Sequence, residues 1–349
     1  MTSAALVDSP PDPAALVRLL GAAPVALDVL GGGRNSRVYR LVAPDGQSMA
    51  LKAYFRHPGD RRDRLGAEFG ALTFLRRQGL ACVPAPLAAD PAAGLALYEF
   101  VDGAKASAPT PAEVDQAAAF LVSLRELRAR PGAEALPPAS EARFALAAVA
   151  DNVESRLQSL AEGAPALAGF LADELVPAWR AALARCRERC QSGGIPFAQE
   201  LPPAARTLSP SDFGFHNALR RNGQLVFLDF EYFGWDDPAK MIADFLLHPG
   251  MDLAPGLRIR LAEAVLRGFP DLPGLRERVR AAHPLFAIKW CTILLNEFLP
   301  GALDRRRFAA AGTPRSAEDA LQRQARQLAK TREKLQWIRD DHDPLQPAP

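Results

Sequence analysis

The spacing of apolar residues changes near residue 104, and this change limits the folds that the chain can adopt. Before it, short runs such as 37–42 and 49–54 carry the alternation and flanking turn residues of β-strands. After it, apolar residues recur at helical spacing, beginning at the capping box Thr110-Pro111-Ala112-Glu113. We find no internal repeat. The pattern predicts an α+β protein in which a strand-rich part precedes a larger helical part.

The strand-rich part is expected over residues 20–103, as a small antiparallel sheet with one helix. Residues 1–19 are expected to form a loose segment and a short helix that begins after Asp12. The segment 31–36 and the turn Pro44-Asp45-Gly46 separate the first strands. The expected elements are strands at 25–30, 37–42, 49–54 and 95–101, and a helix at about 60–78.

The helical part is expected over residues 104–342, and the tail 343–349 is expected to be frayed. One hairpin interrupts the helices, with the turn Asn222-Gly223 joining residues 217–221 to 224–230. The expected helices cover about 111–130, 140–162, 165–191, 238–248, 257–269, 275–299 and 316–341.

Composition and charge exclude several classes of protein. The 349 residues carry a formal net charge of only +2, which gives no electrostatic case for nucleic-acid or membrane-surface binding. The longest apolar stretches are broken by charge, as by Lys289, and none approaches the ~20 residues of a membrane span. Four cysteines do not make a disulfide framework, and the polar start shows no secretory signal. We expect a cytoplasmic protein without nucleic-acid or membrane partners, of unspecified oligomeric state.

Three features of the strand-rich part are candidates for a phosphate site. The segment Gly31-Gly32-Gly33-Arg34-Asn35-Ser36 is either a hairpin turn or a loop whose backbone N–H groups approach an anion. Lys52 interrupts an apolar strand, so it either extends outward at an edge or faces a site. Glu68 shares the apolar face of its helix with Leu65 and Leu72. It either stays solvated at the edge of that face or pairs with Lys52, because a buried unpaired carboxylate is costly.

Three polar residues flank the hairpin of the helical part. Asp212 lies in the loop Ser209-Pro210-Ser211-Asp212-Phe213-Gly214-Phe215-His216-Asn217, and Asn217 begins the first strand. Asp229 ends the apolar second strand, which turns back beside Asn217. Packing explains a carboxylate at the end of such a strand poorly, so the group indicates a site.

Together these residues resemble the aminoglycoside phosphotransferase and choline kinase-like branch of the protein-kinase fold, over about residues 20–300. That family has a nucleotide-binding strand lysine, a helix glutamate paired with it, a D-x-x-x-x-N catalytic loop and a metal-binding aspartate. These features correspond in order and spacing to Lys52, Glu68, Asp212 with Asn217, and Asp229. The resemblance implies a bilobal protein-kinase-like fold, with a nucleotide-clamping lobe at 20–103 and a catalytic, acceptor-binding lobe at 104–342.

Asp212-Phe213-Gly214 also spells the D-F-G of protein kinases, in which the aspartate binds Mg²⁺. We interpret Asp212 as the catalytic base instead, because residues 174–211 contain no aspartate that could take that role. Pro210 stands where the family has a histidine that supports the loop, which leaves the support of this loop in question.

The resemblance implies an ATP- and Mg²⁺-dependent phosphotransferase that moves the γ-phosphate to a hydroxyl of a small molecule, such as an aminoglycoside, sugar or amino alcohol. Asp212 would accept the proton of that hydroxyl, and Asn217 and Asp229 would hold Mg²⁺. Lys52, oriented by Glu68, would hold the α- and β-phosphates. The remaining nucleotide contacts would be Gly32, Gly33, Asn35 and Ser36 in the loop and Glu99 and Val101 in the hinge beside adenine.

The segment after Asp229 is expected to border the acceptor hydroxyl. It combines an aromatic face with carboxylates, which suits stacking on a sugar or pairing with an amine. Trp235 can instead belong to the core, and Asp237-Pro238 can be the N-cap and first turn of a helix. Lys289 and Glu297 interrupt an apolar helix and are further candidates. The expected acceptor residues are Glu231, Trp235 and Asp236.

Two other functions fit the same fold. A nucleotide-binding pseudokinase could act as a scaffold, although such proteins usually lose one of the five polar residues that this chain retains. A protein kinase would need a long activation segment ending in A-P-E, which is not recognisable here.

The remaining candidates are given structural interpretations. We interpret Cys186 and Cys190 as packing residues and the helix at 316–341 as solvated and amphipathic. His216 either touches phosphate or has a structural role.

Overall fold

The structure is a computed structural model that describes residues 10–32, 35–56, 62–251, 253–300, 317–340 and 343–346. The chain divides into two compact units. Among the described residues, the first unit contains the chain up to Lys105, the segment Ala218–Tyr232 and residues 317–320. The second contains Ala106–Asn217, Phe233–Pro300 and the chain from Leu321 onward. The mixed α+β composition predicted from the sequence is confirmed.

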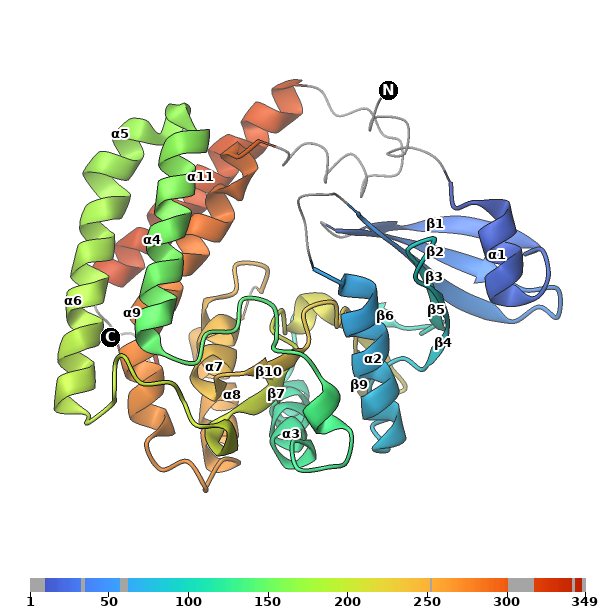
Figure 1. Cartoon of the computed structure of the whole chain (residues 1–349), viewed down its shortest axis with the longest axis horizontal. Coiled ribbons are helices and arrows are strands. Elements are labelled where there is room, and N and C mark those ends of the chain that lie inside the picture. Colours follow the sequence, from blue (N-terminus) through green and yellow to red (C-terminus); the bar gives the residue numbers. More distant parts are fainter. Residues whose placement is uncertain are drawn as a thin grey trace. The chain divides into compact units, whose positions relative to one another are not determined.

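The first unit is built on a five-stranded antiparallel sheet with the strand order β1-β2-β3-β5-β4 (Figure 1). Helix α1 (Pro13–Leu20) precedes the sheet, and α2 (Arg64–Arg77) follows β3. The predicted antiparallel sheet with its helix is therefore present. The strands are β1 (Ala26–Gly32), β2 (Ser36–Val42), β3 (Ser48–Tyr54), β4 (Pro86–Asp90) and β5 (Leu95–Glu99).

The two faces of this sheet have different neighbours. Leu51 of β3 is buried in an apolar cluster with Leu16 of α1 and Leu41 of β2. Because successive strand residues point to opposite faces, Lys52 projects from the other face, where Glu68 of α2 contacts it. The sheet thus separates an apolar core from a polar face that α2 covers.

A second, smaller sheet of the first unit contains the predicted hairpin. Its strand order is β6 (Ala104–Lys105), β8 (Ala218–Arg221) and β9 (Gln224–Phe227). Asn222 and Gly223 both have positive φ, 52° and 75°, as the two-residue turn of a hairpin requires. The sequence placed this hairpin in the helical part, whereas the structure groups Ala218–Tyr232 with the first unit.

The second unit is mainly helical, and α9 packs against α4, α6 and α7. The predicted helices are present, but the one expected at 165–191 contains a π-helical segment, Leu171–Leu175, before α6. Two short strands, β7 (Thr207–Ser209) and β10 (Gly234–Asp236), pair antiparallel. The main helices are α3 (Pro111–Leu127), α4 (Leu146–Gly163), α5 (Ala168–Phe170), α6 (Val176–Ser192), α7 (Pro238–Leu247), α8 (Pro255–Arg267), α9 (Leu275–Leu294) and α11 (Ala317–Arg339).

The C-terminal segment differs in part from its prediction. Helix α11 is amphipathic as predicted, with Leu335 and Ile338 buried. The residues 343–346, expected to be frayed, are packed instead, because Asp343 forms an ion pair with Arg280 at 2.8 Å and Leu345 is buried.

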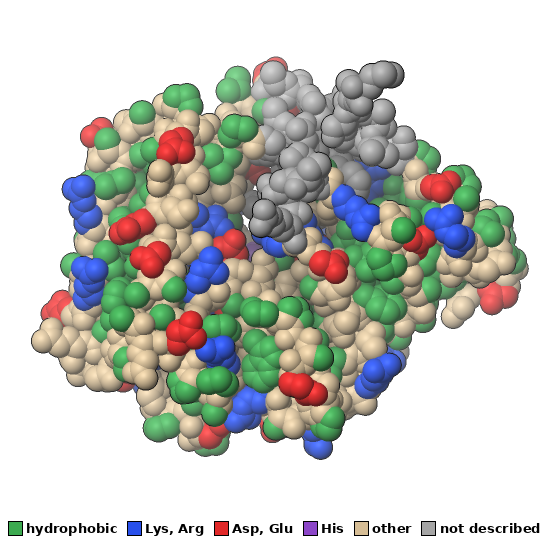
Figure 2. All heavy atoms as spheres, viewed as in Figure 1, with side chains coloured by type: hydrophobic (Ala, Val, Ile, Leu, Met, Phe, Trp, Pro, Cys, Tyr) green, Lys and Arg blue, Asp and Glu red, His purple; other side chains and the backbone are tan. Residues whose placement is uncertain are grey.

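The surface and the helices bear on the classes excluded above. On the face shown in Figure 2, basic and acidic side chains are interspersed rather than gathered into one patch of a single sign. Within the described ranges, no helix combines the length and apolarity needed to cross a membrane. The buried Cys186 and Cys190 lie in α6, in keeping with packing.

Candidate active site

In the first unit, Lys52 is the centre of a buried group of carboxylates. Its Nζ lies 2.6 Å from Oε2 of Glu68 and 2.5 Å from Oδ1 of Asp229. The predicted contact between Lys52 and Glu68 is therefore confirmed. Burial by itself lowers the pKa of Lys52, but the charges of Asp229, Glu68 and Glu231 raise it well above its usual value. Lys52 is thus held as a cation.

Glu68 is fixed by two hydrogen bonds besides its contact with Lys52. Its Oε2 accepts a hydrogen bond from the Tyr54 hydroxyl at 2.7 Å, and that hydroxyl lies 2.7 Å from the hydroxyl of Tyr98. Its Oε1 accepts a hydrogen bond from the backbone N–H of Phe230 at 3.3 Å. The helix, the sheet and the segment after β9 therefore set the position of the carboxylate that orients Lys52.

Asp229 and Glu231 bring two more carboxylates to the group. Asp229 has φ 65°, a conformation that costs a non-glycine residue energy and is commonest at functional sites. Its side chain is 31% exposed, whereas Glu231 is buried. Oε1 of Glu231 accepts a hydrogen bond from Nδ2 of Asn35 at 2.8 Å. Its buried Oε2 has no hydrogen-bond partner within the part of the chain that the structure describes.

The carboxylates of this group have capacity for a cation. One oxygen each from Glu68, Asp229 and Glu231 lies within 4.8 Å of the others. Burial and the neighbouring Asp229 charge raise the pKa of Glu231 to about 7, so a further positive charge beside it would favour its ionised form. Hard cations such as Mg²⁺ prefer oxygen ligands of this type. The donor set therefore fits Mg²⁺.

The other predicted nucleotide residues differ in what the structure shows. Asn35 and Ser36 are buried, and Gly32 pairs with Arg37 at the end of β1. Gly33 lies outside the described residues. The Glu99 carboxylate is used internally, by Arg221 at 2.6 Å and by the backbone N–H of Ala85 at 3.1 Å. The backbone N–H of Glu99 also donates to the carbonyl of Ala85 at 2.8 Å, so neither its carboxylate nor its N–H is open to a nucleotide. Val101 is buried.

In the second unit, Asp212 lies in the loop after β7. The preceding residue, Ser211, has φ 65°. The backbone N–H of Ser211 donates to Oγ of Ser209 at 3.1 Å, and its own Oγ donates to the carbonyl of Ser140 at 3.3 Å. The Asp212 side chain is 33% exposed. These two hydrogen bonds fasten the loop at the residue before Asp212.

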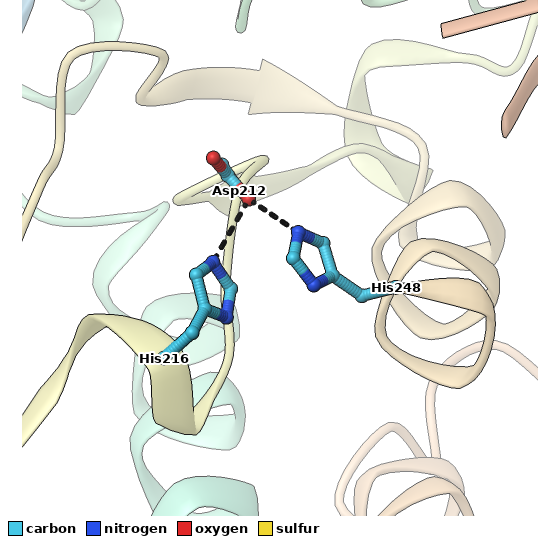
Figure 3. Close-up of side chains that lie close together, drawn as sticks. All are labelled: Asp212, His216 and His248. Carbon is cyan, nitrogen blue, oxygen red and sulfur yellow. Dashed lines mark hydrogen bonds and ion pairs between the residues drawn. The ribbon is translucent and has the colours of Figure 1, made fainter. Parts of the chain in front are cut away.

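Two histidines contact the Asp212 carboxylate, as Figure 3 shows. Nε2 of His216 lies 3.2 Å and Nε2 of His248 lies 3.0 Å from Oδ1. Burial would raise the pKa of Asp212, but the hydrogen bonds and charges of both histidines outweigh it and hold the pKa below its usual value. Asp212 is therefore ionised over the physiological range of pH.

Asn217 ends the 3₁₀ turn Phe215–Asn217 that leads out of this loop. Its Nδ2 donates a hydrogen bond to the backbone carbonyl of Asp212 at 3.2 Å. Because this bond uses the amide nitrogen, Oδ1 is the atom with which Asn217 can ligate a cation.

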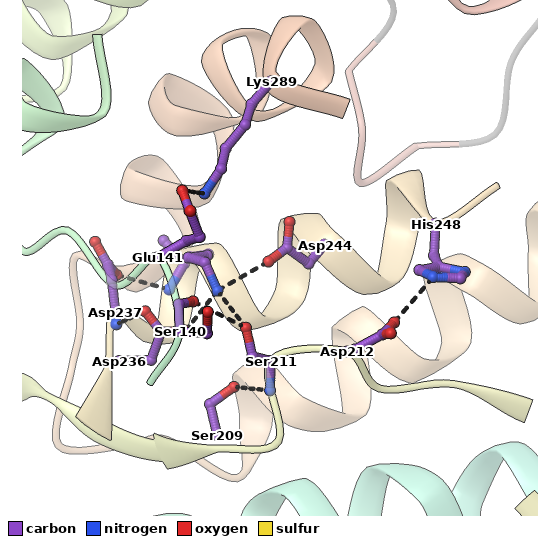
Figure 4. A network of polar contacts seen from close by, with 12 residues as sticks. Ser140, Glu141, Ser209, Ser211, Asp212, Asp236, Asp237, Asp244, His248 and Lys289 are labelled. Carbon is purple, nitrogen blue, oxygen red and sulfur yellow. Dashed lines mark hydrogen bonds and ion pairs between the residues drawn. The ribbon is translucent and has the colours of Figure 1, made fainter. Parts of the chain in front are cut away.

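A second buried lysine, Lys240 of α7, also lies among carboxylates. Its Nζ is 2.6 Å from Asp236 and 3.0 Å from Asp244, and it donates to Oγ of Ser211 at 3.0 Å. Asp236, Asp244 and Ser211 are drawn in Figure 4. Burial by itself lowers the pKa of Lys240, but both aspartates raise it above its usual value. Lys240 thus links α7 to the residue that precedes Asp212.

The predicted acceptor role of Asp236 is not supported by its surroundings. The residue is 0% exposed, one oxygen accepts from the backbone N–H of Asp237 and the other pairs with Lys240. Asp237 is the N-cap of α7 and pairs with Arg278 at 2.6 Å, in agreement with the alternative reading of Asp237-Pro238. Trp235 is half-buried and its Nε1 donates to the carbonyl of Ala133 at 3.0 Å.

The two further candidates, Lys289 and Glu297, also belong to the second unit. Lys289 of α9 is buried and points toward Glu141, 3.8 Å away (Figure 4). Burial lowers the pKa of Lys289 to about 8. Glu297 lies in the 3₁₀ turn Leu295–Phe298.

Sequence comparison now identifies the family. The sequence profile described as phosphotransferase enzyme family matches residues 27–278, which is most of the chain. This chain belongs to the phosphotransferase enzyme family. A search of curated protein sequences finds no match.

Solved structures place this phosphotransferase in the kinase-like fold. The streptomycin–ATP ternary complex of APH(2″)-IIa has a TM-score of 0.56 and 14% identity, and covers 92% of this chain and 96% of its own. Amicoumacin kinase hAmiN with AMP-PNP, Ca²⁺ and Ami has a TM-score of 0.54 and 15% identity, covering 95% and 93%. A choline/ethanolamine kinase family protein from Mesorhizobium loti has a TM-score of 0.51 and 20% identity, covering 90% and 92%.

Sequence reasoning missed two residues of this phosphotransferase that the geometry singles out, His248 and Lys240. His248 follows α7, far along the chain from Asp212, and no local spacing connects them. Lys240 did have a signal, because Asp236 and Asp244 lie four residues before and after it, the spacing of ion pairs along one helix face.

Proposed function

We propose that this phosphotransferase transfers the γ-phosphate of ATP to a hydroxyl group of a small molecule, with Mg²⁺ as its cofactor. The observation that carries the proposal is the pairing of Lys52 with both Glu68 and Asp229, beside the unpartnered oxygen of Glu231. The lysine cation suits the phosphates of a triphosphate, and carboxylate oxygens that can still ligate a cation suit its metal ion.

The first unit would bind the nucleotide. Lys52, oriented by Glu68, would bind the α- and β-phosphates, and Asp229 would bind Mg²⁺. Mg²⁺ would neutralise charge on the β- and γ-phosphate oxygens. Asn35, Ser36 and the end of β1 at Gly32 would lie over the phosphates, and the backbone at Glu99 and Val101 would contact adenine.

The second unit would act on the acceptor. Asp212 is ionised, and its Oδ1 is taken by two histidines, so Oδ2 would accept the hydrogen bond and then the proton of the acceptor hydroxyl. Asn217 would contribute its Oδ1 to the metal. Glu231 would serve the metal rather than the acceptor, and Asp236 would support the loop through Lys240. Of the three predicted acceptor residues, Trp235 is left as a ring on which an acceptor could stack.

The class of acceptor is supported by the structures of similar fold. Their names include a streptomycin–ATP complex, an amicoumacin kinase and an ethanolamine kinase. These are small molecules, and we propose the same class for this chain.

The test is an ADP-release assay with Mg·ATP, and Mg·GTP in parallel, over streptomycin, gentamicin, choline, ethanolamine and a set of sugars. We expect ADP release with at least one acceptor, a product heavier by one phosphoryl group, and loss of both in Asp212→Asn. Tight Mg·ATP binding with no phosphorylated product would contradict the proposal and favour a nucleotide-binding scaffold.

A further inference from the structure

The two imidazoles beside Asp212 converge on one oxygen of its carboxylate. Both Nε2 atoms lie near Oδ1, at 3.2 Å for His216 and 3.0 Å for His248 (Figure 3). Within the described residues, neither histidine is recorded in contact with Oδ2. The two oxygens of Asp212 are therefore in different surroundings, one bound on the protein side and the other left for a ligand.

The tautomer of His248 follows from its second ring nitrogen. Nδ1 of His248 accepts a hydrogen bond from the backbone N–H of Gly250 at 3.1 Å. A neutral imidazole that accepts at Nδ1 carries its proton on Nε2, so His248 donates to Asp212. Burial lowers the pKa of His248, although Asp212 opposes this, in keeping with a neutral donor.

Two aromatic rings hold the His248 ring. It stacks on His216 with centroids 4.0 Å apart and planes within 8°. It also meets Trp290 of α9 edge-on, at 4.9 Å and 82°. Nε1 of Trp290 donates to Asp244 at 2.9 Å, and Asp244 pairs with Lys240. The ring is thus connected to the same ion cluster that holds Ser211.

Two glycines provide the space for these rings. A Cβ placed on Gly250 would lie 2.8 Å from Cε1 of His248, and one on Gly214 would lie 2.9 Å from Nδ1 of His216. Real Cβ contacts are essentially never that short. The backbone on both sides is therefore shaped to admit the histidine pair.

The same three side chains are of the types that bind transition metals, and their donor atoms are close enough together. The ring geometry favours hydrogen bonds instead. A metal ion lies in the plane of each imidazole that binds it, and two nearly parallel planes 4.0 Å apart share no such position. A hydrogen bond from each Nε2 to one carboxylate oxygen tolerates a larger departure of that oxygen from the ring plane.

We propose that His248 is a positioning residue for Asp212. It holds Oδ1 so that Oδ2 faces the acceptor hydroxyl, and it does so from the residue that follows α7. His216 assists from within the loop. The inference rests on the proposed function for its kinetic consequence and on the hydrogen-bond geometry for its structural part.

The kinetic test uses His248→Ala and His248→Gln, because the Gln amide nitrogen can donate from nearly the same position as Nε2. His283→Gln is the matched control: His283 is buried in the same unit, edge-on to Trp337, with no contact to Asp212. Turnover is followed as ADP release with the best acceptor of the panel above, or with water when no acceptor reacts. We expect His248→Ala to lower kcat on the order of 10²-fold, since a displaced catalytic group costs about this much. KM for ATP should stay within about twofold, and His248→Gln should recover most of the rate.

A second measurement separates this inference from the proposed function. In the full chain with ¹⁵N-labelled histidine, the His248 resonances, assigned by their loss in His248→Gln, should show a proton on Nε2. An unchanged kcat in His248→Ala, a proton on Nδ1, or a bound Zn²⁺ that is lost in His248→Ala would overturn the inference. A wild-type chain that phosphorylates nothing, yet shows the Nε2 proton, would contradict the proposed function and leave the hydrogen bond established.

Discussion

Two lysines of this protein lie buried among carboxylates, and their surroundings differ. Lys52 in the first unit contacts Glu68 and Asp229, and Lys240 in the second contacts Asp236 and Asp244. Asp229 is 31% exposed, whereas Asp236 is fully buried. Residue types alone therefore do not separate a ligand site from a structural ion cluster, whereas the exposure of the carboxylates does.

The bonding capacity that remains in each cluster leads to the same conclusion. Beside Lys52, the buried Oε2 of Glu231 has no hydrogen-bond partner among the described residues. Beside Lys240, both oxygens of Asp236 are used, and the lysine also binds Ser211. The first cluster can take a cation or a phosphate in addition, and the second serves to hold the Asp212 loop.

The largest expected effect on stability comes from removing Lys240 from its cluster with Asp236 and Asp244. Lys240→Met leaves two buried carboxylates without a cation and should lower the free energy of unfolding by about 3–5 kcal/mol. Lys330→Met on the exposed face of α11 is the matched control and should change it little. Urea denaturation measures both.

Lys52→Met should lower the free energy of unfolding less than Lys240→Met. Burial raises the pKa of Glu68 and Glu231, so both can become neutral when the lysine is lost, and Asp229 keeps contact with water. Equal losses of stability in the two variants would show that the clusters are not different in kind.

A third buried lysine extends the comparison to pH. Among the described residues, Lys289 has a single ion-pair contact, with Glu141 at 3.8 Å, and burial together with the charge of Lys240 lowers its pKa to about 8. Below that pH the folded chain holds a poorly solvated charge, so Lys289→Met should raise the stability at pH 7 by up to about 3 kcal/mol.

The sign of the pH dependence follows from the protons bound. Between about pH 8 and the unfolded pKa near 10.4, the unfolded chain binds more protons at Lys289 than the folded chain does. The free energy of unfolding of the wild type therefore rises with pH relative to that of Lys289→Met, and the difference between the two proteins shrinks. Denaturant titrations of both proteins at pH 7, 8 and 9 would test this, and a constant difference would show that Lys289 does not titrate there.

The comparison also shows what the sequence could and could not predict. Lys52 and Glu68 were recognisable because each interrupts an apolar strand or helix face, and a buried charge in such a place needs a partner. The burial of Asp236 could not be predicted, because whether a carboxylate after Asp229 faces solvent depends on the pairing of β10 with β7 and not on its neighbours in sequence. His248 reaches Asp212 only through the packing of α7, and no residue spacing encodes that contact.

A smaller effect measures the Lys52–Glu68 contact itself. In a double-mutant cycle on kcat/KM, Lys52→Met and Glu68→Gln should be non-additive by about 0.5–3 kcal/mol, since the two side chains share one ion pair. Strictly additive losses would mean that Glu68 does not act through Lys52.

The smallest effect is expected at Asp236. Because its oxygens are used inside the second unit, Asp236→Asn should leave the acceptor KM within about twofold while lowering stability. A large rise in the acceptor KM, with the KM for ATP unchanged, would return Asp236 to the acceptor site.

The central claim is that the cluster of Lys52 with its carboxylates binds the nucleotide and that Asp212 serves the chemical step. Titration calorimetry of Mg·ATP on wild type, Lys52→Met and Asp212→Asn, beside kcat for each, tests it most directly. Loss of a charged hydrogen bond should weaken Mg·ATP binding by about 10- to 100-fold in Lys52→Met. Asp212→Asn should bind Mg·ATP within about twofold of wild type and lower kcat by about 10²–10⁴. Loss of Mg·ATP binding in Asp212→Asn, with Lys52→Met unaffected, would contradict the account.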